Sequence, residues 1–138
     1  MKSAKWMLPV TLLLLSGLMA AQSITSSTVV AQVPFDFMVN NKIIPAGECV
    51  VRAVSGNVLA IQNVEARKSA LASSSHANAS KGDRTVMVFE GYGSQYFLSE
   101  IRIEGSNLSY KLPQSRAEIE LRAQNAPATQ QTLLASLE

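Results

Sequence analysis

Phe35-Asp-Phe-Met-Val-Asn-Asn-Lys-Ile-Ile44 is the stretch of sequence that decides the fold class. Phe35, Phe37 and Val39 fall on one side of an extended chain, with a charged residue between the two rings, which is the period of two typical of a half-buried strand. Asn40-Asn41 then supplies a turn that tolerates positive φ, after which a second short strand begins. The stretch therefore predicts two strands joined by a tight turn.

Outward from this stretch, the chain repeats short apolar segments separated by turn signals. A strand at 48–54, between Pro45-Ala-Gly47 and Ser55-Gly-Asn57, is expected to pair with one at 58–62 in a second hairpin. Residues 84–90 are apolar on both faces, and further strands are expected at 95–104 and 108–112. A weaker segment at 66–72 leads into a polar stretch, 73–83, which predicts an exposed loop. The pattern indicates a mainly β domain, a small antiparallel sandwich or barrel of seven to eight strands.

The last regular segment, Arg116 to Ala123, carries two conflicting signals. Ser115-Arg-Ala-Glu118 has the form of a capping box, and its residues are good helix formers. The same residues alternate polar and apolar side chains, which is a strand pattern. We predict one short C-terminal helix, because the cap and the propensities agree. Residues 125–138 are expected to form a mobile tail.

The N-terminus resembles an export signal. Lys2 and Lys5 form a basic start, and an apolar run from Trp6 to Ala21 follows. This run is shorter than the roughly twenty residues that span a bilayer, so a cleaved signal peptide over 1–21 is favoured over a membrane anchor. We expect cleavage after Ala20 or Ala21, a flexible leader at 22–32, one β domain with its helix at 33–124, and a periplasmic or secreted location with no membrane span after cleavage.

Composition excludes several classes of function. Without Lys2 and Lys5, the 12 basic residues fall to ten and balance ten acidic residues. A protein of zero net charge lacks the electrostatic footprint of nucleic-acid binding. One Cys and one His cannot form an intrachain disulfide or a Cys/His zinc site. The sequence therefore predicts no metal and no cofactor.

The single His and the single Cys have few features of catalytic residues. His76 lies in the polar stretch without an acidic neighbour that could orient it as a general base. Cys49 alternates with Val51 and Ala53 along a predicted strand, so we expect it to pack as a small apolar residue. Pairing of Cys49 with another chain stays open, because the expected compartment is oxidising.

The other polar groups also fit structural roles. Glu100 and Glu104, on one strand face, would lie about 13 Å apart, too far for a glycosidase pair. They indicate a solvated face with Arg102 between them. Gly91-Tyr-Gly93 predicts a turn and not a phosphate loop, and Ser115 predicts a helix cap and not a nucleophile. No catalytic, cofactor-binding or metal-binding residue is therefore predicted.

Four segments resemble a group of small exported bacterial proteins of unknown function. They are Val33-Pro-Phe-Asp-Phe37, Ile44-Pro-Ala-Gly-Glu48, Tyr96-Phe-Leu-Ser-Glu100 and Leu112-Pro-Gln-Ser-Arg-Ala-Glu118. The chain departs from that group at Cys49, where an aromatic residue is usual, and at Ile119, where a charged one is. The resemblance implies an exported, mostly β domain and transfers no activity.

These observations favour a non-enzymatic binding or structural domain of the bacterial envelope or secretome. Short antiparallel sheets bind partners through a strand edge or an exposed face, and we expect a protein or envelope partner of this kind. Two alternatives stay open: a small hydrolase whose catalytic residues are dispersed in the sequence, and a carrier of a small hydrophobic ligand inside a barrel. The oligomeric state is also open.

Overall fold

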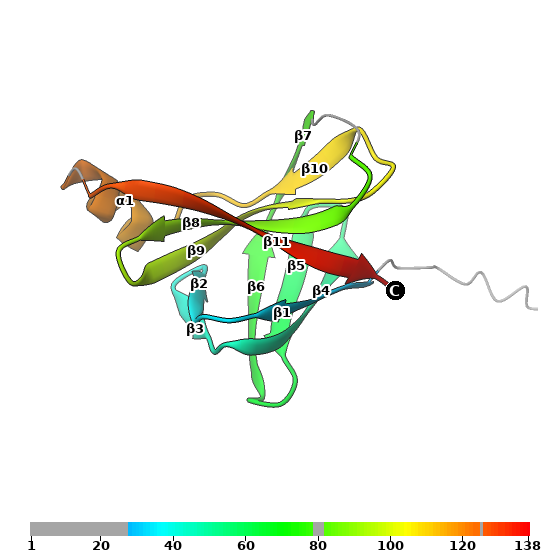
Figure 1. Ribbon diagram of the computed structural model, residues 1–138, viewed down its shortest axis with the longest axis horizontal. Helices are drawn as coiled ribbons and strands as arrows, with labels where there is room; N and C mark the ends of the chain where they lie inside the picture. Colours follow the sequence, from blue (N-terminus) through cyan, green and yellow to red (C-terminus); the bar gives the residue numbers. More distant parts are fainter. Residues whose placement is uncertain (1–27, 79–81, 125) are drawn as a thin grey trace, which may run out of the picture.

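A computed structural model describes residues 28–78, 82–124 and 126–138 (Figure 1). The expected signal peptide, residues 1–21, and residues 22–27 of the expected leader lie outside the described residues. The described part contains eleven strands and one helix: β1 (Thr28–Val33), β2 (Phe37–Val39), β3 (Lys42–Ile44), β4 (Gly47–Ser55), β5 (Val58–Asn63), β6 (Lys68–Ser73), β7 (Ser75–Asn78), β8 (Thr85–Tyr92), β9 (Gln95–Arg102), β10 (Leu108–Lys111), α1 (Arg116–Ala123) and β11 (Ala128–Leu137).

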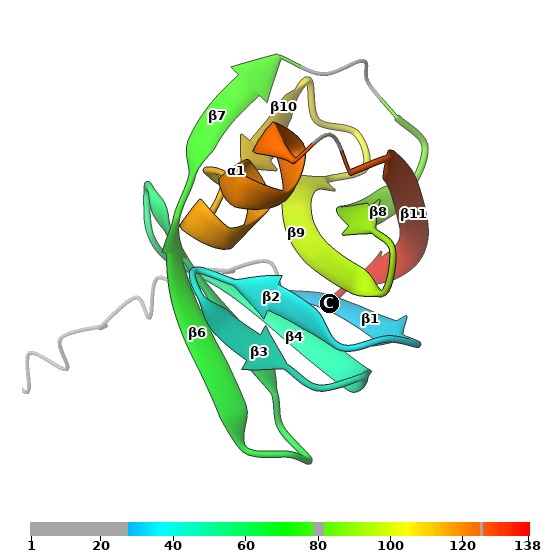
Figure 2. The same ribbon diagram turned by 90° about the vertical axis from the view of Figure 1, so that its left-hand side faces the viewer.

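The strands form one nearly closed, barrel-like sheet. The strand order is β3-β2-β9-β8-β11-β1-β4-β5-β6. Outside this path, β10 pairs with β9 on one side and with β7 on the other. All neighbours are antiparallel except β2 and β9, which pair in parallel at Met38 and Phe97. In Figure 1, β5 and β6 cross steeply beneath β8, β9 and β11. The two end strands of the path, β3 and β6, lie side by side in Figure 2, and the narrow gap between them is here called the seam.

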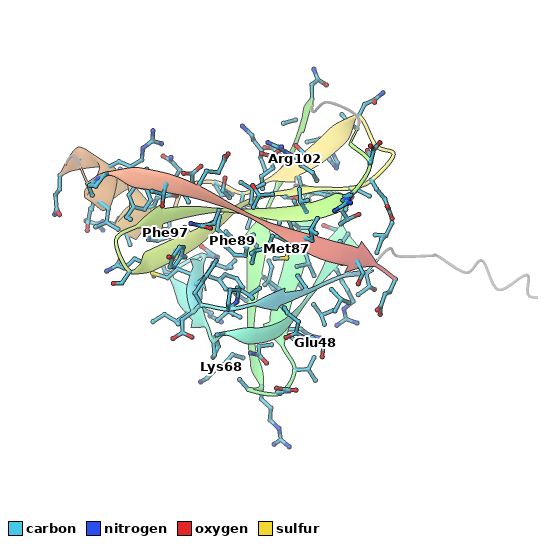
Figure 3. All side chains as sticks on the ribbon, viewed as in Figure 1. Glu48, Lys68, Met87, Phe89, Phe97 and Arg102 are labelled. Atoms are coloured by element: carbon cyan, nitrogen blue, oxygen red, sulfur yellow. The ribbon has the colours of Figure 1, made fainter. Side chains whose placement is uncertain are left out.

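The core fills the inside of this sheet with side chains from almost every strand. Phe35 stacks on Tyr96 with ring centroids 3.9 Å apart and meets Phe89 edge-on at 5.0 Å, while Phe37 meets Phe89 at 5.1 Å. Met87 and Phe89 are fully buried and lie between the two halves of the sheet in Figure 3. Aromatic pairs of this geometry add about 0.5–1.5 kcal/mol each beyond the burial of their area. The stretch from Phe35 to Ile44 therefore contributes the two rings of Phe35 and Phe37 to the packed interior of the barrel.

The structure confirms the mainly β class and the expected hairpins. Residues 37–39 pair with 42–44 around Asn40 and Asn41, whose φ values of +48° and +64° are those of a two-residue turn with both central residues in the left-handed region. Strand β4 pairs with β5 as expected. The helix at Arg116–Ala123 is also confirmed, so the capping signal prevails over the alternation. Within the described residues, no helix is long and apolar enough to cross a bilayer.

Four expectations are corrected. There are eleven strands and not seven to eight. The leader expected at 22–32 contributes β1, whose Val29, Ala31 and Val33 are buried. Within the loop expected at 73–83, residues 75–78 form β7. The tail expected to be mobile forms β11, which lies between β8 and β1.

These segments form strands because of their partners more than their own side chains. In β7, three of four residues are exposed, and the strand is held by its ladder with β10. No residue of β11 is fully buried, yet eight of its residues pair with β8 and its end pairs with β1. Two backbone hydrogen bonds between Thr28 and Glu138, at 2.9 and 2.7 Å, extend the pairing of β1 with β11. Pairing of this kind leaves a weak signal in the sequence.

Candidate functional site

The helix α1 is anchored to the sheet by a carboxylate. Ser115 caps the helix, and its hydroxyl accepts a hydrogen bond from the Glu118 backbone N–H at 3.3 Å. In a complete capping box the Glu side chain would reach back to the N-cap N–H. Here the Glu118 carboxylate turns instead toward the sheet, where the Tyr92 hydroxyl donates to Oε1 at 3.4 Å. The helix is thereby fixed to the end of β8, on the face opposite to Phe89.

The Glu118–Tyr92 pair is almost completely removed from water, since these residues are 4% and 5% exposed. Burial raises the pKa of Glu118, and the negative charge of Glu90 raises it further, while the Tyr92 hydrogen bond and the positive charge of Arg122 act in the opposite direction. Burial and the Glu118 charge also raise the pKa of Tyr92. The pair therefore holds a proton more tightly than ordinary side chains do.

A polar cleft of about 270 Å³ opens beside this pair. Its volume lies just below the range of about 300–1,000 Å³ common for small-molecule sites. The lining contains two carboxylates and two cations but neither His nor Cys: Glu90, Tyr92, Ser99, Lys111, Leu112, Gln114, Glu118, Arg122 and Ala128. The cleft offers a proton donor of raised pKa, while its lining supplies no imidazole base. We regard the Glu118–Tyr92 pair as the anchor of α1.

His76 and Cys49 lie apart from this cleft. His76 is on β7, where its ring lies 5.0 Å from that of Tyr110. Cys49 is 1% exposed inside the barrel, and burial raises the pKa of its thiol to about 12. A thiol of such a high pKa is a poor nucleophile at neutral pH. Cys49 therefore packs as an apolar residue, and its burial keeps it from another chain.

The prediction that Glu100, Arg102 and Glu104 form a solvated face is partly wrong. Arg102 Nε does pair with Glu100 Oε1 at 3.0 Å, but Glu100 is 7% exposed and not solvated. Burial opposes its charge, yet the Arg102 hydrogen bonds, the close Ser109 hydroxyl and the charges of Arg102 and Lys111 lower the pKa of Glu100 overall. Ser109 Oγ itself is buried without a hydrogen bond of ordinary geometry. Glu104 is exposed, and its backbone N–H bonds to Thr85.

Of the turn expected over Gly91-Tyr-Gly93, only Gly93, with a φ of +67°, lies in the turn, because Gly91 and Tyr92 belong to β8. Gly91 is also required by space, since a Cβ there would lie 2.9 Å from the Tyr96 ring. Sequence reasoning placed Glu118 in the capping box and did not connect it with Tyr92. Their pairing spans 26 positions, and the capping box explained Glu118 locally, so no signal in the sequence connected the two.

The seam between β3 and β6 presents backbone groups that the sheet leaves without a strand partner. The Asn40 side-chain amide donates to the Leu71 carbonyl oxygen across the seam at 3.1 Å. The Leu71 carbonyl therefore points away from β5. Because N–H and C=O of one residue in an antiparallel strand point to the same side, and alternate along it, Ser69 and Leu71 both direct their backbone groups into the seam.

A buried amide holds the far end of the seam together. Asn63, 2% exposed, donates through Nδ2 to the carbonyl oxygens of Pro45 at 3.0 Å and Ala46 at 3.2 Å. Its Oδ1 accepts from the Ala66 N–H at 3.1 Å. One side chain therefore fixes the turn after β3 to the turn before β6. Gly47, with a φ of +136°, is needed there, because a Cβ would lie 3.0 Å from Asn63 Nδ2.

An open groove of about 640 Å³ runs along this end of the seam. Its lining comes from the start of β3, the turn after it and the start of β6: Asn41, Lys42, Ile43, Pro45, Arg67, Lys68 and Ser69. Ile43 and, on the opposite strand, Leu71 are 62% and 58% exposed. Lys68 lies at the end of the barrel away from Arg102 in Figure 3. The seam-facing backbone groups of Ser69, the exposed Ile43 side chain and three cations thus meet in one groove.

The barrel interior is packed. The apolar cavity between Val51, Ala53, Leu59 and Tyr110 measures about 50 Å³, far below the volume of a ligand site. In the part of the chain that the structure describes, no group of three His, Cys, Asp or Glu side chains could hold a metal ion. Comparison with protein-family models, with curated proteins and with solved structures finds no match to this chain.

Proposed function

We propose that this chain is an exported, non-enzymatic domain that binds an extended segment of a partner protein along the seam edge of β6. The observation that carries the proposal is the orientation of Ser69 and Leu71. Both belong to an end strand of the sheet and direct N–H and C=O groups away from β5. An extended segment satisfies such groups by adding a strand to the sheet.

The side chains around this edge support binding there. A free edge gives affinity through the main chain, while specificity comes from contacts with alternate side chains. Ile43 and Leu71 offer apolar surface on the two sides of the seam. The Asn63 hydrogen bonds keep the flanking turns in place, so little ordering is needed on binding. Strand β7, which ends the side branch through β10, has four residues and is mostly exposed polar surface.

A binding role agrees with the chemistry of the candidate residues better than catalysis does. His76 faces Tyr110, Cys49 has a raised pKa, and Glu100 is neutralised by Arg102. A general base or nucleophile needs a positioned partner that activates it. None of these three groups has one, so we assign no catalytic step to the chain.

The export part of the proposal depends on the basic and apolar N-terminal sequence and on the resemblance to small exported bacterial proteins. The full chain should be expressed in a bacterial host, which is then fractionated, and the intact mass of the product measured. We expect a periplasmic or secreted product that lacks about the first 21 residues. A full-length product in the cytosol would contradict export.

A library of random linear decamers tests binding at the seam directly. Decamers selected on the immobilised wild-type domain should bind it in fluorescence anisotropy, and Ser69→Pro should abolish this binding, because proline has no N–H to donate to an added strand. Ser69→Ala keeps the N–H and is the matched control. The proposal fails if no decamer is enriched, or if Ser69→Pro binds the selected decamers as well as Ser69→Ala does.

A further inference from the structure

We infer that the segment bound at the seam carries acidic side chains, which meet Lys42, Arg67 and Lys68, and apolar side chains, which meet Ile43 and Leu71. This inference rests on the proposed function and adds the chemical class of the partner. Its basis is the charge of the groove and the exposed apolar side chains in and beside it.

None of the three cations of the groove forms an ion pair with a carboxylate in the part of the chain that the structure describes. The ion pairs among the described residues are Arg102–Glu100 and Arg116–Glu120, and both lie elsewhere. The groove lining contains three basic residues and no acidic one. Glu65, two residues before Arg67, is outside that lining. An acidic ligand would therefore meet unpaired positive charges, which is the complementarity that selects partners at interfaces.

This positive groove is a local feature and not a result of overall charge. From residue 28 onward the chain has ten basic and ten acidic residues. Three of the ten cations nevertheless gather at one end of the seam, on two elements that are distant in sequence. A groove of one sign on a neutral protein concentrates ligands of the opposite sign at that place.

The local structure fixes where these cations lie. Arg67 has a φ of +54° and closes the turn before β6 through its N–H, 3.3 Å from the Val64 carbonyl oxygen. Asn63 ties this turn to Pro45, three residues after Lys42. Along β6 the order is then Lys68, the edge group of Ser69 and the edge group of Leu71. A segment that pairs with Ser69 and Leu71 thus lies beside the cations of the groove and beside the exposed Ile43 and Leu71 side chains.

The test uses three capped, fluorescein-labelled decamers of Ser, Thr and Val that carry three Glu, three Gln or three Lys residues at one terminus, with each terminus tried. The Glu decamer should bind wild type at least ten-fold more tightly than the Gln decamer, and the Lys decamer most weakly. Three exposed ion pairs supply a difference of about this size. In the K42E/R67E/K68E variant the order of Glu and Lys decamers should reverse.

Lys68→Glu and Arg84→Glu provide the matched comparison, because each changes the net charge equally and Arg84 is an exposed residue outside the groove lining. Only Lys68→Glu should weaken binding of the Glu decamer. If Glu and Gln decamers bind equally, and Ser69→Pro abolishes both, the inference is wrong while the seam function stands. If no decamer binds and none is selected from the library, the proposed function itself fails.

Discussion

The Asn40 side-chain amide and the Leu71 carbonyl oxygen are 3.1 Å apart, and their hydrogen bond bridges the seam where β2 and β3 approach β6. It occupies a backbone acceptor that an added strand would otherwise use. A side chain therefore bridges each end of the seam, Asn40 at one end and Asn63 at the other, and the groove that the proposed partner would enter opens beside these two bridges.

Replacing Asn40 by Gly should separate stability from binding. Glycine keeps the positive φ of this position but removes the amide. We expect a loss of about 0.5–1 kcal/mol in the free energy of unfolding, the usual net value of one exposed hydrogen bond. A selected decamer should bind a few-fold more tightly, because it displaces no intramolecular bond. Urea denaturation and fluorescence anisotropy measure the two effects, and weaker binding would show that the Asn40 bond supports the site.

Asn63 should be among the most sensitive polar positions in the chain. Asn63→Ala removes three part-buried hydrogen bonds and leaves the backbone groups of Pro45, Ala46 and Ala66 without this partner. We expect a loss of about 2–3 kcal/mol in urea denaturation. Asn63→Asp should be at least as harmful, since a carboxylate cannot donate to the Pro45 and Ala46 carbonyl oxygens. A loss below about 0.5 kcal/mol would mean that the two turns do not depend on this clamp.

Residues 128–138 should be essential for folding. Strand β11 pairs with both β8 and β1, so its removal exposes two edges in the middle of the sheet. A chain truncated after Pro127 should lose the cooperative thermal transition in circular dichroism. A truncated chain that melts like the full one would instead indicate a dispensable tail.

The fold class could be predicted because its signal is local. Phe35, Phe37 and Val39 repeat with period two, and Asn40-Asn41 favours the turn that the structure contains. Strand β11 also alternates Leu133, Ala135 and Leu137, which pack partly against the core, but the Gln and Thr residues before them hid this pattern. Strand β7 has no apolar alternation, and its pairing with β10 could not be seen without the tertiary structure.

The candidate site was harder to predict than the fold, because it depends on contacts between distant residues. The seam forms where Asn40 reaches Leu71, 31 positions away, and where Asn63 reaches Pro45, 18 positions away. The sequence indicated a partner bound at a strand edge without showing which strand ends the sheet. Lys42, Arg67 and Lys68 carry no motif, and they become a group only when β3 and β6 lie side by side.

The Glu118 anchor should make stability depend on pH. Its folded pKa is raised, so the folded state binds the proton more tightly than the unfolded chain does. The anchor's contribution is complete below the unfolded pKa of about 4.3 and is lost as pH rises through the folded pKa. Glu118→Gln keeps an acceptor for Tyr92 and lacks the titration. The melting temperature of the Glu118→Gln variant should match that of wild type near pH 4 and exceed it at pH 8. Equal melting temperatures at both pH values would contradict a raised pKa of Glu118.

Glu100 should show the opposite dependence. Its pKa is lowered, so its contribution to stability is present above the unfolded pKa and is lost as pH falls through the folded pKa. Arg102→Met should cost about 1–2 kcal/mol at pH 7, a value kept low because the Arg102 side chain is half exposed and screened by water. The cost should shrink in acid, where Glu100 is protonated. A cost that is independent of pH would point to lost packing of the Arg102 stem.

Hydrogen exchange of single backbone amides, measured by NMR with and without a bound decamer, tests the seam most directly. An added strand must cover the N–H groups of Ser69 and Leu71, so their exchange should slow at least ten-fold, while the amides of residues 49–52 in β4, which pair with both β1 and β5, stay unchanged. If the decamer binds and the exchange of Ser69 and Leu71 does not slow, the partner lies elsewhere on the protein and the seam is not its site.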